Sequence, residues 1–204
     1  MEVRMEVGGV SVDGILEVPD GAKSVVIFAH GTGSSRFSPR NRYVAEALRK
    51  IGLGTLLFDL LTDEEDQLYE NRFNIDILAT RLSAATDWLL GKVQVKSVGY
   101  FGASTGAAAA LQASVKHPHV RAIVSRGGRP DLAWDYLGGV TAPTLLVVGG
   151  NDKEVLMLNE QALGRLRTRK NLVVVPGATH LFEEPGTLEE VARVATEWFR
   201  EFLG

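Results

Sequence analysis

The chain has 204 residues, of which 45% are hydrophobic and 23% are charged, and its formal net charge is −3. Its length and composition are those of an ordinary globular protein and predict a single domain over residues 1–204. A weakly acidic chain without a basic cluster gives no reason to expect nucleic acid or a membrane as a partner. The absence of cysteine excludes disulfides, thiolate metal sites and a thiol nucleophile.

The first residues, 1–7, alternate between apolar and polar side chains and include acidic ones, so they do not resemble a secretory signal. No apolar run reaches the length needed to cross a bilayer. These two observations predict a cytoplasmic protein.

Residues 2–18 alternate around Gly8-Gly9, which predicts a β-hairpin. Short apolar runs typical of buried strands follow along the chain, at residues 24–29, 53–58, 98–101, 120–124, 144–148 and 172–175. Apolar residues recur at helical spacing between them, after Pro39, at 75–89 and at 188–202. This alternation predicts an α/β fold with a mostly parallel sheet of about eight strands and helices on both faces. The polar stretch 62–71 is too short for a cap domain and predicts at most a small flap.

The pentapeptide Gly102-Ala103-Ser104-Thr105-Gly106 lies between a predicted strand and an alanine-rich helix. A strand that turns at once into a helix brings two backbone segments together, which favours glycine at both flanking positions. Ser104 would be strained, with its hydroxyl exposed above the sheet. This is the strand, turn and helix context of a nucleophile elbow.

Two further polar residues follow later strands. Asp152 comes after the run 144–148, and His180 comes after the run 172–175. Ligands of an open α/β sheet bind at the carboxyl ends of its strands, so these side chains are expected near Ser104. Histidine ordinarily titrates near neutrality and can take the serine proton, and an aspartate can orient the ring. The sequence therefore predicts Ser104, Asp152 and His180 as nucleophile, orienting acid and base.

An acyl-transfer site also needs backbone donors for the oxyanion. The N–H of Thr105 directly follows the nucleophile and starts a helix, where amides are unpaired. The second donor is expected in the loop His30-Gly31-Thr32-Gly33, with the N–H of Thr32 favoured over that of Gly33.

Other residues admit competing interpretations. Asp131 also follows a strand and could be the acid, but a helix N-cap is favoured for it, and Asp59 precedes the nucleophile in the chain. His30 is expected to hold the oxyanion loop by a hydrogen bond. Arg36, Arg126 and Arg129 either recognise an acidic substrate group or pair with acidic loop residues. His117 and His119 are expected to cap a helix end or to face water. Glu183 and Glu184 are expected to be solvated.

The motifs at 30–33, 102–106, 149–152 and 179–180 together resemble the α/β-hydrolase superfamily, and more narrowly its small cap-less branch similar to dienelactone hydrolases. The resemblance covers nearly the whole chain and implies the α/β-hydrolase fold. The stretch 31–41 resembles hydrolase domains that are sometimes fused to phosphoribosyltransferases. Dienelactone hydrolases use a cysteine nucleophile, whereas this chain has Ser104, so the resemblance favours general carboxylester hydrolysis over the dienelactone reaction.

These observations predict a serine carboxylester hydrolase that acts on small or short-acyl esters through an acyl-enzyme, without a metal or cofactor. A thioesterase, acyltransferase or peptidase would use the same residues. A non-catalytic binding protein on the same fold is the third possibility. The expected partner is a small-molecule ester, and the sequence does not indicate an oligomeric state.

Overall fold

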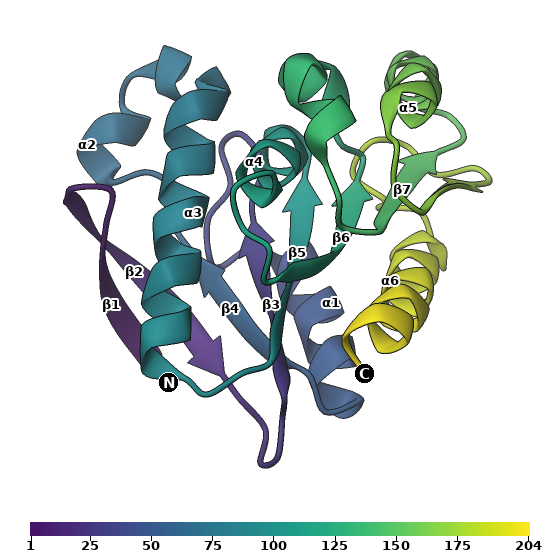
Figure 1. Cartoon of the computed structure of the whole chain (residues 1–204). Coiled ribbons are helices and arrows are strands. Elements are labelled where there is room, and N and C mark those ends of the chain that lie inside the picture. Colours follow the sequence, from purple (N-terminus) through teal and green to yellow (C-terminus); the bar gives the residue numbers. More distant parts are fainter.

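The computed structural model describes all residues from Met1 to Gly204. Its centre is a sheet with the strand order β1-β2-β4-β3-β5-β6-β7-β8 (Figure 1). Strand β2 pairs antiparallel with β1 on one side and with β4 on the other, and every other neighbouring pair is parallel. The strands are β1 Glu2–Val7, β2 Val10–Glu17, β3 Ser24–Ala29, β4 Gly54–Phe58, β5 Ser97–Ala103, β6 Val120–Arg126, β7 Thr144–Gly149 and β8 Lys170–Val175.

Helices cover both faces of this sheet, as the alternating sequence pattern predicted. One face carries α1 (Pro39–Lys50) and α6 (Thr187–Leu203), whose apolar residues pack with Phe28, Phe101 and their neighbours into one core cluster. The other face carries α3 (Ile75–Lys92), α4 (Thr105–Ser114), α5 (Lys153–Arg165) and the 3₁₀ segment η2 (Pro130–Gly139). The two apolar layers hold the sheet as a rigid platform.

Small side chains let α4 lie close to the sheet. The residues Ala107 to Ala110 are all fully buried, and they pack between the strands and the flanking helices α3 and η2. Alanine has the highest helix propensity, so the same residues that allow this close approach also favour the helix. The start of α4, which carries the predicted nucleophile, is fixed by this packing.

The polar stretch after β4 forms two short helices, α2 (Asp63–Asp66) and the 3₁₀ segment η1 (Tyr69–Phe73). The Thr62 hydroxyl accepts the N–H of Glu65, and the Glu65 carboxylate accepts the N–H of Thr62, which is a complete capping box. The predicted flap is therefore ordered and small, and no cap domain covers the sheet.

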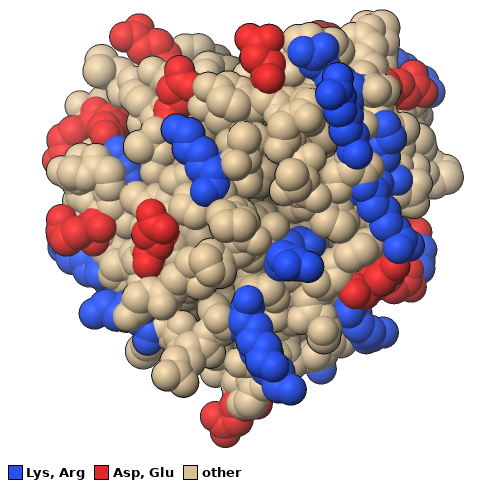
Figure 2. All heavy atoms as spheres, viewed as in Figure 1, with Lys and Arg blue, Asp and Glu red and all other residues tan.

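Acidic and basic side chains both occur on the face seen in Figure 2, with uncharged surface between them, so neither sign dominates it. No helix is long and apolar enough to cross a membrane.

A buried hydroxyl pair ties α3 to β5. The Thr86 hydroxyl donates to the Leu82 carbonyl at 2.9 Å and lies 2.6 Å from the Tyr100 hydroxyl, which leaves it as the acceptor of the Tyr100 proton. Both side chains are fully buried, and burial raises the pKa of Tyr100, so the phenol stays protonated.

The Thr86→Val substitution should cost about 2 kcal/mol of unfolding free energy, because it leaves the Tyr100 hydroxyl buried without an acceptor. The Tyr100→Phe substitution should cost only about 1 kcal/mol, because Thr86 keeps its bond to Leu82. Urea unfolding of both variants and of the double variant measures this. A double variant whose cost equals the sum of the two single costs would contradict the coupling.

Candidate active site

Ser104 lies at the turn between β5 and α4 with φ 50° and ψ −120°, a backbone conformation that non-glycine residues rarely adopt. Two contacts explain why the flanking residues are glycines. A Cβ on Gly106 would lie 2.2 Å from the Ala29 carbonyl oxygen, and one on Gly102 would lie 2.4 Å from the Ala107 Cα. Ser104 also occupies the N-cap position of α4, yet its hydroxyl caps no backbone N–H. The strained turn therefore presents a hydroxyl that is free for another role.

Asp152 and His180 meet across the ends of β7 and β8. The His180 Nδ1 lies 2.6 Å from the Asp152 Oδ2, at hydrogen-bond distance. Asp152 is the N-cap residue of α5, a position at which aspartate ordinarily caps the helix, but its side chain makes no capping bond. The carboxylate faces the imidazole instead, and the bond leaves the His180 Nε2 free.

Two neighbouring residues, Phe182 and Glu184, hold the segment that carries His180 in place. Phe182 is buried with φ 55°, which is a strained conformation for an aromatic residue. Glu184 accepts both the N–H and the hydroxyl of Thr179, at 3.1 Å and 2.5 Å, and these bonds lower the pKa of its carboxyl. The expectation that Glu184 is merely solvated was therefore wrong, and nothing in the sequence pattern signals this contact.

The loop after β3 packs directly against the elbow. A Cβ on Gly31 would lie 3.0 Å from the Ser104 Cβ, and the hydroxyls of Thr32 and Thr105 are 3.1 Å apart. The N–H groups of Thr32 and Gly33 donate to no acceptor in the protein. The two segments predicted to supply oxyanion donors thus lie side by side, and both Thr32 and Gly33 retain a free N–H.

His30 connects this loop to β4. Its Nε2 accepts the N–H of Leu60 at 3.0 Å, so its proton lies on Nδ1, which donates to the Gly31 carbonyl at 3.0 Å. Burial lowers the pKa of His30, in agreement with a neutral ring. The structure thus places His30 where the sequence analysis expected it, as a support of the loop.

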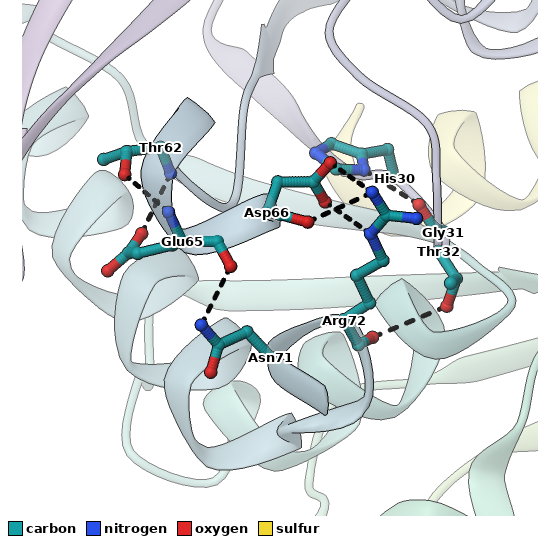
Figure 3. A network of polar contacts seen from close by, with 8 residues as sticks. All are labelled: His30, Gly31, Thr32, Thr62, Glu65, Asp66, Asn71 and Arg72. Carbon is teal, nitrogen blue, oxygen red and sulfur yellow. Dashed lines mark hydrogen bonds and ion pairs between the residues drawn. The ribbon is translucent and has the colours of Figure 1, made fainter. Parts of the chain in front are cut away.

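Figure 3 shows how the small flap reaches the same loop. The Arg72 guanidinium donates to both carboxylate oxygens of Asp66, at 2.8 Å and 2.7 Å, and the Thr32 hydroxyl lies 3.5 Å from the Arg72 carbonyl. Behind it, Glu65 accepts two bonds from the buried Arg81, which lower the pKa of Glu65. Ion pairs therefore hold the flap in place beside the site, and its residue Phe73 lines the pocket.

Ser104 and His180 line one pocket of about 280 Å³ at the carboxyl ends of the parallel strands. Phe73 and Leu181 add partly exposed apolar surface to its wall, and Arg40 and Arg126 add cationic groups. A small, partly apolar recess beside a free serine hydroxyl and a free imidazole nitrogen can hold a small substrate for acyl transfer.

The competing candidates lie elsewhere. Asp131 receives a bidentate contact from Arg129, at 2.9 Å and 2.8 Å, and Arg36 pairs with Asp59. Asp131 is not the expected N-cap either, because Arg129 occupies that position of η2. His117 contacts the Ser83 hydroxyl at 2.8 Å rather than capping a helix end.

Comparison with known proteins places this geometry in a family. The sequence profile of the dienelactone hydrolase family matches residues 12–203. A dienelactone hydrolase from Anabaena variabilis is 55% identical, with a TM-score of 0.95 over 100% of this chain and 98% of that one. A Mycobacterium tuberculosis protein provisionally named a phosphoribosyl transferase is 57% identical over 99% of this chain but only 46% of its own length. The chain thus spans about half the length of the curated relatives it matches.

Two more distant structures share the fold. The protein Est1E from Butyrivibrio proteoclasticus, solved with ferulic acid bound, has a TM-score of 0.85 at 18% identity over 98% of both chains. A serine α/β hydrolase without a lid from Xanthomonas campestris has a TM-score of 0.82 at 19% identity, over 100% of this chain and 94% of that one. The fold is that of the α/β hydrolases, and the chain belongs to the dienelactone hydrolase family.

Proposed function

We propose that this α/β hydrolase is a serine carboxylester hydrolase that acts on small or short-acyl esters through an acyl-enzyme. The observation that carries the proposal is the 2.6 Å contact between His180 and Asp152, with His180 sharing a pocket with the uncapped hydroxyl of Ser104. The chain order of these residues, Ser, Asp and His, is that of the α/β-hydrolase fold.

In the acylation step, the Ser104 Oγ attacks the ester carbonyl carbon while the His180 Nε2 takes the hydroxyl proton. The bond to the alcohol then breaks, and the imidazolium returns the proton to the leaving oxygen. Asp152 keeps the Nδ1 proton in place and stabilises the positive charge that forms on the ring. A water molecule, activated by the same nitrogen, releases the acid and regenerates Ser104.

The tetrahedral intermediates of both steps carry a negative oxygen. The N–H of Thr105 has no carbonyl partner one helical turn earlier, and the loop Gly31 to Gly33 supplies a second free N–H beside it. We assign the second donor to Thr32, because its side chain contacts that of Thr105. One such donor typically contributes about 3 kcal/mol to lowering the barrier.

The size of the pocket supports small substrates. At about 280 Å³ it lies near the lower end of ligand pockets, and no cap domain extends it into a channel for a long acyl chain. We also propose that residues 1–204 form one domain and that the transferase name of the longer Mycobacterium tuberculosis relative concerns its other half. Turnover of thioesters, amides and alcohol acceptors in a substrate panel would separate an esterase from a thioesterase, peptidase or acyltransferase.

The Ser104→Ala variant should lose at least about 10⁴-fold in kcat on p-nitrophenyl acetate and butyrate, because no nucleophile remains. It should also fail to react with a fluorophosphonate probe that labels the wild type. Ser35→Ala is the matched control, because Ser35 lies in a nearby loop outside the pocket. Turnover by Ser104→Ala above the uncatalysed background would reject the mechanism.

The His30→Ala variant should lower kcat on p-nitrophenyl butyrate by about 10- to 100-fold with little change in KM. The reason is that the Gly31 carbonyl loses its donor and the oxyanion loop is no longer held against Ser104. His119→Ala, on the surface, serves as control. A variant with normal kcat would show that the loop needs no such support.

The same histidine should make stability depend on pH. Because the pKa of His30 is lowered from 6.5 in the folded state, the unfolded state takes up its proton first as pH falls. The unfolding free energy should therefore decrease below about pH 6.5 and level off below the folded-state pKa. Urea unfolding from pH 7.5 to 5 should show a smaller decrease in His30→Ala. The pKa of His117 is also lowered, but His117 is present in both proteins and cancels in the comparison.

A further inference from the structure

Arg126 is a buried cation without a partner. It is the last residue of β6, is 7% exposed, and its side chain forms no hydrogen bond or ion pair in the protein. Its Nε is fully buried and unsatisfied. The Arg126 guanidinium carbon lies 5.9 Å from the centroid of the Phe182 ring, within cation–π range.

Such an arrangement is costly for the folded protein. An arginine is almost never buried unless it is paired, because removing its charge from water costs several kcal/mol. Burial and the positive charge of Arg40 lower the pKa of Arg126 to about 10, so the group stays charged near neutral pH. Arg36 and Arg129, in contrast, each form an ion pair with a carboxylate.

Arg40 adds a second cationic group to the lining of the same pocket. It lies in the first turn of the helix α1, whose N-terminal end also favours anions. Its Nε is buried without a partner, and its only carboxylate contact is to Glu183 at 3.5 Å, which is 66% exposed. Glu183 contacts only Arg40 and is largely exposed, so it leaves Arg126 without a carboxylate, and both positive side chains line the same pocket.

Both arginines line the pocket that contains Ser104 and His180. Phe73 and Leu181 give the same pocket an apolar wall, and both side chains are partly exposed there. A substrate that fills the pocket would place a short apolar portion along this wall and a polar end against the arginines. The charge that compensates Arg126 would then come from the substrate.

We propose that Arg126 and Arg40 form a subsite for an oxyanion carried by the ester substrate, a carboxylate or a phosphate, within the pocket of Ser104. This inference rests on the proposed function, whose substrate class it narrows. Guanidinium groups bind both anions through paired N–H···O bonds, and the terminal nitrogens of Arg126, which lines the pocket, form no hydrogen bond within the protein.

A matched pair of substrates tests the proposal. The monoester of glutaric acid with p-nitrophenol carries a terminal carboxylate, and p-nitrophenyl pentanoate has an acyl chain of the same length without the charge. The wild type should prefer the anionic ester in kcat/KM, and this ratio should fall about 10- to 100-fold in Arg126→Met and in Arg40→Gln. Arg42→Met removes an exposed charge from the same helix outside the pocket and should leave the ratio unchanged.

Binding to the Ser104→Ala protein separates this proposal from the proposed function. Calorimetry should detect glutarate or inorganic phosphate, and the affinity should fall at least about tenfold when Arg126→Met is added. The tighter of the two ligands identifies the anion. Arg126-dependent binding in a protein that hydrolyses no ester would retain the subsite and reject the esterase.

Stability gives a third measurement. Removal of an uncompensated buried charge should raise the Tm of Arg126→Met by about 2–4 °C, and glutarate or phosphate should raise the Tm of the wild type but not of the variant. Hydrolysis of both esters at equal rates, together with no Arg126-dependent binding of either anion, would overturn the proposal.

Discussion

The close contact between β3, the β5–α4 turn and the first residues of α4 is the constraint on which the site depends. The Ala29 carbonyl approaches Gly106 so closely that only hydrogen fits at that position. This approach brings the loop that follows β3 against Ser104, and it sets the strained backbone of Ser104 itself. The alanines of α4 maintain the contact from above, because larger residues would push the helix away from the sheet. Strain of this kind persists only where surrounding packing determines the backbone.

Helix starts recur around the site, and the residues there do not behave as ordinary caps. Ser104 begins α4 and Asp152 begins α5, but neither side chain caps its helix. An uncapped N-terminus costs about 1 kcal/mol, so each helix gives up stability to leave a polar side chain free. Thr62, which begins α2, behaves in the opposite way and forms a complete capping box. The difference separates the two residues of the candidate site from a residue that only stabilises the neighbouring flap.

The sheet, the covering helices and the gathering of Ser104, Asp152 and His180 at one edge of the sheet could be predicted because they follow from local patterns. Apolar runs identify buried strands, and polar residues just after such runs must gather at one edge of a parallel sheet. The sequence pattern indicates the helix α5 less clearly, because the buried Asn159 interrupts its apolar face. The pairing of Asp131 with Arg129 and the isolation of Arg126 could not be predicted, because both depend on where long side chains turn in three dimensions. Sequence spacing predicts an ion pair within a helix, as between Glu46 and Lys50, but it does not show whether an arginine at the end of a strand finds a partner.

The position of α6 has a consequence for the order of folding. This helix is formed by residues Thr187–Leu203, yet it covers strands from the first half of the chain, and the Ser24 hydroxyl donates to the Leu203 carbonyl. Until the residues of α6 have been synthesised and have left the ribosome, the apolar residues of β3 and β5 that α6 covers remain exposed. Contacts of such long sequence separation slow folding, and exposed strands favour aggregation during synthesis. The helix that follows His180 therefore also determines when the central strands are protected from solvent.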